Sequence, residues 1–150
     1  MSSVGKRVIY AGPADGANTS PLNVEGKAVA ATTPGMVVRK TAAGLVINNN
    51  ATTVFGDLFL VADKDQQRTK SVDDAWTINE NMVAIQPRPG EFINVLVVTG
   101  QALIIGTPLM RAASGGALTT ATTAGAAEII CYADETITTF GTELVSVRVA

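Results

Sequence analysis

The sequence FINVLVVTGQALIIGTPLMRAASGGALTT, residues 92–120, decides how the chain folds. It holds short apolar runs, each closed by a turn: Phe92 to Val98 ends at Thr99-Gly100-Gln101, Ala102 to Ile105 ends at Gly106-Thr107-Pro108, and Leu109 to Arg111 precedes Ser114-Gly115-Gly116. Short runs separated by glycine and proline turns are typical of a meander in a β-sandwich or β-barrel. In Phe92 to Val98 both alternating faces are apolar except at Asn94, which predicts a strand buried on both sides.

The rest of the chain continues this pattern of strand-forming runs and turns. Further strand candidates are residues 27–31, 36–39, 45–48, 57–62, 75–78, 82–85, 128–133 and 143–149. Residues 134–141 read as a connector anchored by Ile137 and Phe140. Apolar residues recur with a period of two rather than 3.6, and Val and Thr are abundant. The sequence therefore predicts an all-β chain: a single β-sandwich or β-barrel-like domain over residues 26–150, with an extended N-terminal arm.

Residues 1–25 form that arm in this interpretation. They contain one short apolar run, Val8-Ile9-Tyr10, and then a cluster of turn formers from Gly12 to Pro21 that cannot continue a helix or a central strand. Such a terminus is ordered only where something ties it down. The candidates for an interface with a neighbouring subunit or another partner are Lys6, Arg7, Val8, Ile9 and Tyr10; a frayed tail is the alternative.

The charge of the chain narrows the class of partner. Charged residues make up 16% of the sequence and the net charge is −2, whereas about a quarter of residues is usual. A surface with few charges loses little solvation when a partner covers it, which favours subunit contacts. An ordinary threonine-rich β surface explains the composition equally well. Because no basic stripe is present to neutralise phosphates, we expect no nucleic-acid partner.

Chemistry-bearing residues are sparse. Histidine is absent, which removes Ser-His-Asp and Cys-His catalysis and the commonest transition-metal ligand. Cys131 is the one cysteine and lies in an apolar run, so we expect a buried, inert thiol. The carboxylates of residues 63–65 and 73–74 lack calcium-loop spacing, and Trp76 and Tyr10 are expected to be core or interface anchors. We expect no enzyme, no cofactor and no metal site.

Targeting signals are also missing from the pattern. No apolar run reaches the length of a signal peptide or of a membrane span. A lone cysteine makes no internal disulfide, so the fold does not depend on an oxidising compartment. We therefore expect folding in a cytoplasm and no membrane partner.

Residues 34–149 resemble the small head-decoration, or cement, proteins of tailed bacteriophages. The features that match are a proline–glycine turn leading into a strand (34–38), a strand with a glycine-led hairpin and a second turn (97–109), a glycine turn (115–118) and a closing strand pair (129–135 and 143–149). The N-terminal 25 residues match no part of this pattern.

This resemblance implies a β-rich domain that binds the outside of an assembled capsid lattice, commonly as a homotrimer at local threefold axes. Its partner would be the major capsid protein, which it would clamp against internal genome pressure. The expected location is the outer capsid surface of a virion, after synthesis in the host bacterial cytoplasm. The alternative is another phage tail, fibre or adhesive β-domain with a carbohydrate-binding role.

Overall fold

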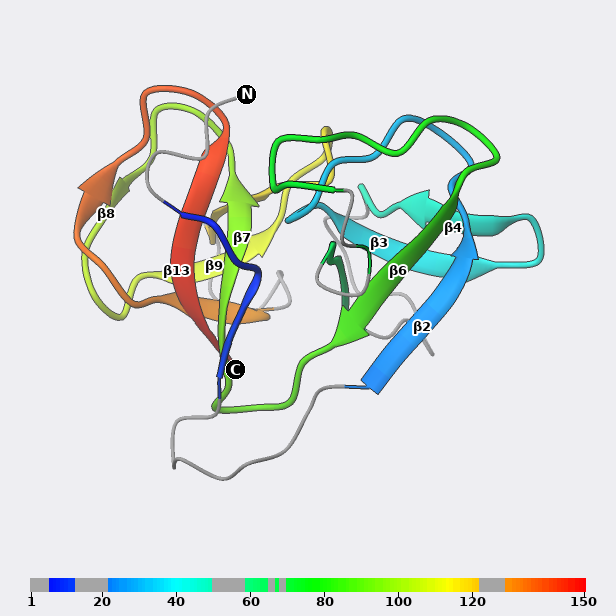
Figure 1. Cartoon of the computed structure of the whole chain (residues 1–150). Helices are drawn as coiled ribbons and strands as arrows, with labels where there is room; N and C mark the ends of the chain where they lie inside the picture. The colour runs from blue at the N-terminus through cyan, green and yellow to red at the C-terminus, as the bar shows by residue number, and fades with distance from the viewer. Residues whose placement is uncertain (1–5, 13–21, 50–58, 65–66, 68–69, 122–128) are drawn as a thin grey trace.

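The computed structural model describes residues 6–12, 22–49, 59–64, 67, 70–121 and 129–150. Within these residues the chain forms thirteen β-strands and no helix, which confirms the all-β prediction. Two units lie side by side, a closed barrel and a second sheet, and residues 87–91 connect them (Figure 1).

The first unit is a closed five-stranded barrel. Around the ring its strands are β7 (Phe92–Val97), β10 (Leu118–Thr120), β9 (Pro108–Arg111), β11 (Cys131–Ala133) and β13 (Glu143–Val149), and β13 pairs with β7 to close it. All contacts are antiparallel except the one between β7 and β10. A two-stranded ribbon of β8 (Ala102–Leu103) and β12 (Ile137–Thr138) stands beside the barrel.

Strand β7 is the centre of the barrel, as its apolar sequence predicts. All five residues from Ile93 to Val97 are buried. One edge of β7 is paired along its whole length with β13. Three segments share the other edge: β1 (Tyr10–Gly12) at its beginning, Gly35 at Leu96, and β10 at its end. Both edges and both faces of β7 are therefore covered.

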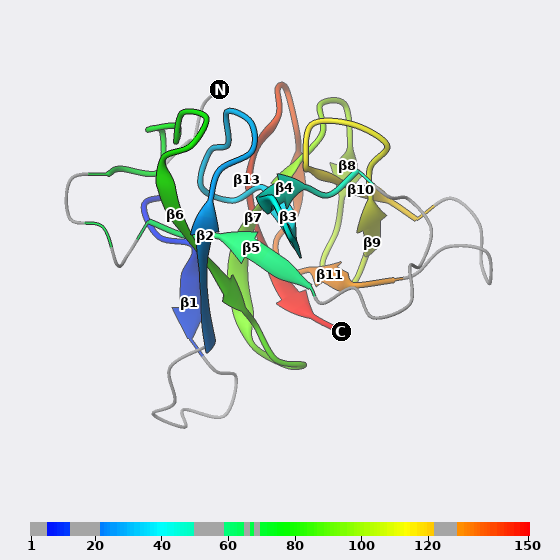
Figure 2. The same ribbon diagram turned by 90° about the vertical axis from the view of Figure 1, so that its right-hand side faces the viewer.

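The second unit is an antiparallel sheet with its own core. Its strand order is β2 (Leu22–Lys27), β6 (Asn81–Gln86), β5 (Leu60–Ala62), β3 (Val37–Thr41) and β4 (Gly44–Ile47). A bridge between Ala28 and Leu45 brings β4 back beside the end of β2, so the sheet curls on itself. Trp76 is fully buried in the apolar cluster that the sheet surrounds. Figure 2 shows this sheet facing the viewer, with the barrel behind it.

Two glycine turns join the units. Gly35 donates its N–H to the carbonyl of Ala62 at 2.9 Å and accepts the N–H of Leu96 at 3.0 Å. Its φ is +91°, and a Cβ at this position would collide with the side chain of Leu144. The carbonyl of Gly116 accepts the N–H of Val37 at 2.7 Å. The main apolar cluster consequently extends from the barrel into the second sheet.

The strands differ from the sequence prediction at several places, and the expected connector of residues 134–141 contains β12. The strand expected at 27–31 lies at Leu22–Lys27, so the expected boundary between arm and domain at residue 25 falls inside β2. Gly26 lets β2 pack closely on Leu45, and a glycine between two charged residues conceals a strand from pattern reasoning. Residues 75–78 form no strand: Trp76 is fully buried and makes an isolated bridge to Thr32.

Candidate interaction site

The predicted interface residues lie against the barrel of their own chain. Ile9 is fully buried, and Tyr10 is half-buried in β1. The Nζ atom of Lys6 lies 3.2 Å from a carboxylate oxygen of Glu135. Arg7 and Val8 are exposed, so they present the side chains that a partner could contact. Residues 6–12 are thus ordered by the domain itself, and the interface role of this segment stays a prediction; residues 1–5 and 13–21 of the expected arm lie outside the described residues.

The hydrogen bonds of Asn94 explain why β7 contains one polar residue. Its side-chain amide donates to the carbonyl of Val8 at 2.8 Å, and its backbone N–H donates to the carbonyl of Ile9 at 2.7 Å. Glu135 provides a second anchor, because its carboxylate accepts the N–H of Ser146 at 2.7 Å as well as the ammonium of Lys6. The sequence shows Asn94 as the one polar residue of an apolar strand. Its hydrogen-bond partner, the carbonyl of Val8, lies 86 residues away, and no local sequence pattern identifies it.

Three large apolar side chains project from turns at the two ends of the β8–β12 ribbon. Ile104 is 66% exposed, Ile105 is 67% exposed and Phe140 is 91% exposed. The sequence prediction that Phe140 anchors its connector is therefore wrong, whereas Ile137 does pack against the main core. A group of exposed large apolar side chains on one element marks a contact surface more often than single ones do.

Hydrogen bonds hold both of these turns in one conformation. Thr107 closes the first turn: its N–H and its hydroxyl donate to the carbonyl of Ile104 at 3.0 and 2.8 Å. In the second turn, the N–H of Phe140 donates to the carboxylate of Glu143 at 3.2 Å, and the hydroxyl of Thr139 donates to the carbonyl of Val98 at 2.7 Å. Because the backbone is already ordered, a partner that covers these side chains loses little free energy to ordering the chain.

An apolar pocket lies at the far end of β13 from Phe140. It has a volume of about 230 Å³ and is lined by Phe59, Gln86, Pro87, Pro89, Ile129, Ile130, Val149 and Ala150. Strand β13 begins three residues after Phe140 and ends at Val149. The turn that carries Phe140 therefore lies at one end of the barrel and the pocket at the other, as the course of β13 shows (Figure 1).

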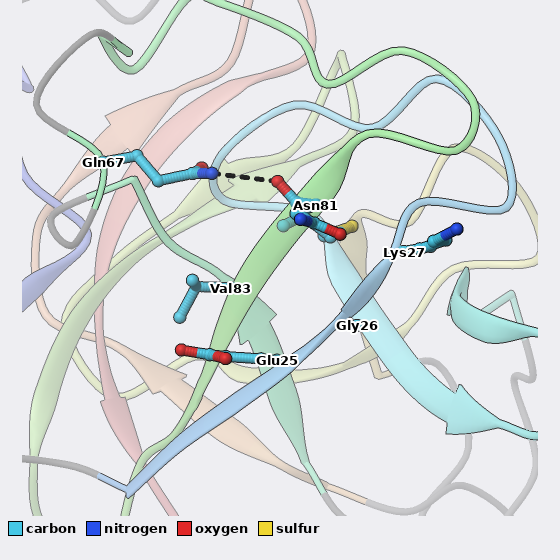
Figure 3. A pocket seen from close by; sticks show the side chains of 7 residues that line it. Glu25, Gly26, Lys27, Gln67, Asn81 and Val83 are labelled. Carbon is cyan, nitrogen blue, oxygen red and sulfur yellow. Dashed lines mark hydrogen bonds between the residues drawn. The ribbon is translucent and has the colours of Figure 1, made fainter.

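A second, polar hollow lies on the outer side of β2 and β6. It is an open groove of about 520 Å³ lined by Glu25, Gly26, Lys27, Gln67, Asn81, Met82 and Val83 (Figure 3). The Gln67 amide bridges its rim: it donates to the carbonyl of Asn81 at 2.9 Å and accepts the indole N–H of Trp76. Glu25 and Lys27 are the charged residues of the groove lining.

The described residues show few groups with reactive chemistry. No group of three or more Cys, Asp or Glu side chains within them could hold a metal ion. Burial raises the pKa of the Cys131 thiol, which keeps it protonated. Trp76 is fully buried and offers no exposed ring for stacking on a sugar. In this part of the chain no helix is long and apolar enough to cross a membrane.

No family model and no curated protein matches this chain. Its function is therefore inferred from the surfaces described above and from the resemblance in its pattern of strands and turns. The features that bear on function are the exposed apolar turns, the apolar pocket and the N-terminal segment.

Proposed function

We propose that the protein is a structural component of a phage virion that binds the outer surface of the capsid lattice. In that role it bridges neighbouring major capsid proteins and acts as a homo-oligomer, with a trimer favoured by the resemblance. The observation that carries the proposal is the display of apolar side chains on hydrogen-bonded turns at the two ends of one ribbon. Ile104 and Ile105 at one end and Phe140 at the other supply two separate contacts, one for the capsid and one for another copy. Rigid, exposed apolar groups are suited to contact between proteins.

The physical mechanism of such a clamp is linkage. A protein that binds the expanded lattice, and not the unexpanded one, stabilises the expanded form by its own binding free energy. Each copy that touches more than one capsid subunit adds avidity without new chemistry. The low charge of the chain, 16% of residues, keeps the desolvation cost of such contacts small.

The direct test is cosedimentation of the purified protein with empty capsids, expanded and unexpanded. We expect the wild type to pellet with expanded capsids and to raise the temperature at which they disrupt. Recovery of all the protein in the supernatant with both forms would contradict the proposal.

The same assay tests the N-terminal segment. Deleting residues 1–12 would also remove the buried Ile9, so surface substitutions are the better probe. We expect Arg7→Glu combined with Val8→Asp to reduce capsid occupancy while the fold is kept, because both side chains are exposed. Asn23→Asp, an exposed position on β2, is the control and keeps full occupancy.

A second candidate function is adhesion through carbohydrate binding in a tail or fibre. The polar groove favours it, since Glu25, Lys27 and the exposed Asn81 could hydrogen-bond to sugar hydroxyls. A glycan array separates the two functions. Binding to a defined glycan that is abolished by Glu25→Ala, together with no binding to capsids, would support adhesion instead.

A further inference from the structure

We propose that Phe140 of one copy fills the apolar pocket at the end of β13 in a second copy. The contact would assemble copies head to tail. It deepens the proposed function, on which its role in a virion rests, because it specifies how the homo-oligomer forms.

Size and chemistry match between the two surfaces. Phe140 has 91% of its surface exposed, and the pocket has a volume of about 230 Å³. A cavity of roughly 150 Å³ lined by apolar side chains is enough to hold a benzene ring. The pocket lining contains no charged side chain. The Glu143 carboxylate, which accepts the N–H of Phe140, is already buried within its own chain, and the exposed Arg88 on the pocket rim keeps its charge in solvent at the edge of the contact. Inserting Phe140 into the pocket therefore strips solvent from no further ionised side chain.

The two surfaces cannot meet within one molecule. They lie at opposite ends of β13, a strand of seven residues, which spans roughly 20 Å at the usual rise of a strand. Phe140, the knob, and the pocket are different surfaces, so the contact between two copies is heterologous. Repeating this contact closes a ring of copies if the rotation between them permits, and otherwise it forms an open chain. A closed ring is consistent with the trimer that the resemblance implies.

The area of the contact indicates that Phe140 is its anchor and not the whole interface. An aromatic side chain buries about 150–250 Å², whereas a stable interface needs about 800 Å² from each partner. The remaining area has to come from the turns beside Phe140 and from the proline-rich rim of the pocket, Pro87 to Pro89. These segments have ordered backbones, as the bond from Glu91 N–H to Arg88 C=O at 3.1 Å illustrates for the rim.

Light scattering after gel filtration, over a range of protein concentrations, measures the oligomer directly. We expect the wild type to form an oligomer and Phe140→Ala to associate roughly tenfold to a hundredfold more weakly. Ile78→Ala is the matched control, because Ile78 is 65% exposed on a different turn, and it should keep the wild-type mass. A wild type that stays monomeric throughout, or a Phe140→Ala protein with unchanged mass, would overturn the proposal.

Mixing two variants tests the head-to-tail geometry. Ile129→Asp places a carboxylate in the pocket at a residue that is 38% exposed, and Pro89→Asp does the same at an exposed position should the first variant fail to fold. Either pocket variant and Phe140→Ala should each be monomeric. Their equimolar mixture should give a heterodimer, because one intact knob meets one intact pocket. A mixture that remains monomeric contradicts the assignment.

Cosedimentation with capsids separates this contact from the proposed function. Protein that is monomeric alone but binds expanded capsids would disprove the contact and leave the function standing. Protein that forms Phe140-dependent oligomers but binds neither capsid form would support the contact and disprove the proposed function.

Discussion

Gly35 joins the two units of the molecule with its backbone alone. Its φ of +91° lies in the left-handed region, and the space beside its Cα is filled by Leu144 and Leu96. Gly35→Ala therefore combines backbone strain with a steric clash. We expect it to lower the free energy of unfolding by about 2–4 kcal/mol. Urea unfolding followed by Trp76 emission measures the change.

Gly90 supplies the matched control for this substitution. Its φ is +87°, close to that of Gly35, but a Cβ there would meet nothing within 4 Å. Gly90→Ala should therefore report the cost of backbone strain alone, about 1–2 kcal/mol. Equal losses for the two variants would show that the contact with Leu144 is not restrictive.

The segment that leads into β1 is held by a side chain of β7. Asn94→Leu keeps the size of the side chain but leaves the carbonyl of Val8 without its side-chain donor. A lost bond of this kind costs about 1–2 kcal/mol, so β1 should detach roughly tenfold more often. The rate of trypsin cleavage after the exposed Arg7 measures that opening. Asn23→Leu on β2 is the control, and equal cleavage of Asn94→Leu and the wild type would contradict the role of Asn94.

The strands of the apolar core could be predicted from local patterns, whereas β2 and β12 could not, and no pattern gave the strand partners. The apolar faces of Phe92 to Val98 correctly indicated a strand buried on both sides. Closure of the barrel depends on β13 pairing with β7, where Val145 lies opposite Val95. Other valine-rich runs in the chain could pair with β7 equally well by pattern, so the sequence does not identify β13 as its partner.

The candidate surfaces were harder to predict for a related reason. An apolar side chain such as Phe140 carries the same sequence signal whether it packs against the domain or faces solvent, and the sequence prediction made it an anchor of its connector. Ile9 shows the opposite case, since it was expected at an interface and is fully buried. The pocket at the end of β13 brings together Phe59, Pro89, Ile129 and Val149. These residues are distant in sequence, so no spacing rule reveals it.

On the scale of the whole molecule, the barrel and the second sheet share one apolar cluster. Val37, Val61 and Ile85 of the second sheet belong to the same cluster as β7 and β13. We therefore expect the two units to unfold together in a single transition. Trp76, the one tryptophan, reports the second core by its emission, and far-ultraviolet circular dichroism reports all strands. Coincident midpoints in urea are the expected result, and an earlier change in Trp76 emission would show that the second sheet unfolds independently.

The six residue pairs between β13 and β7 have a mechanical consequence. Their hydrogen bonds run perpendicular to the strands. If copies are joined through Phe140 at one end of β13 and through the pocket at the other, tension in the ring is directed along that strand. Because both attachments lie at the ends of one strand, the covalent backbone of β13 carries that tension. Any part of the force passed on to β7 loads all the bonds of the ladder together in shear, whereas a force across the strand would break them one after another. The barrel would then carry tension in the direction in which its longest ladder resists best.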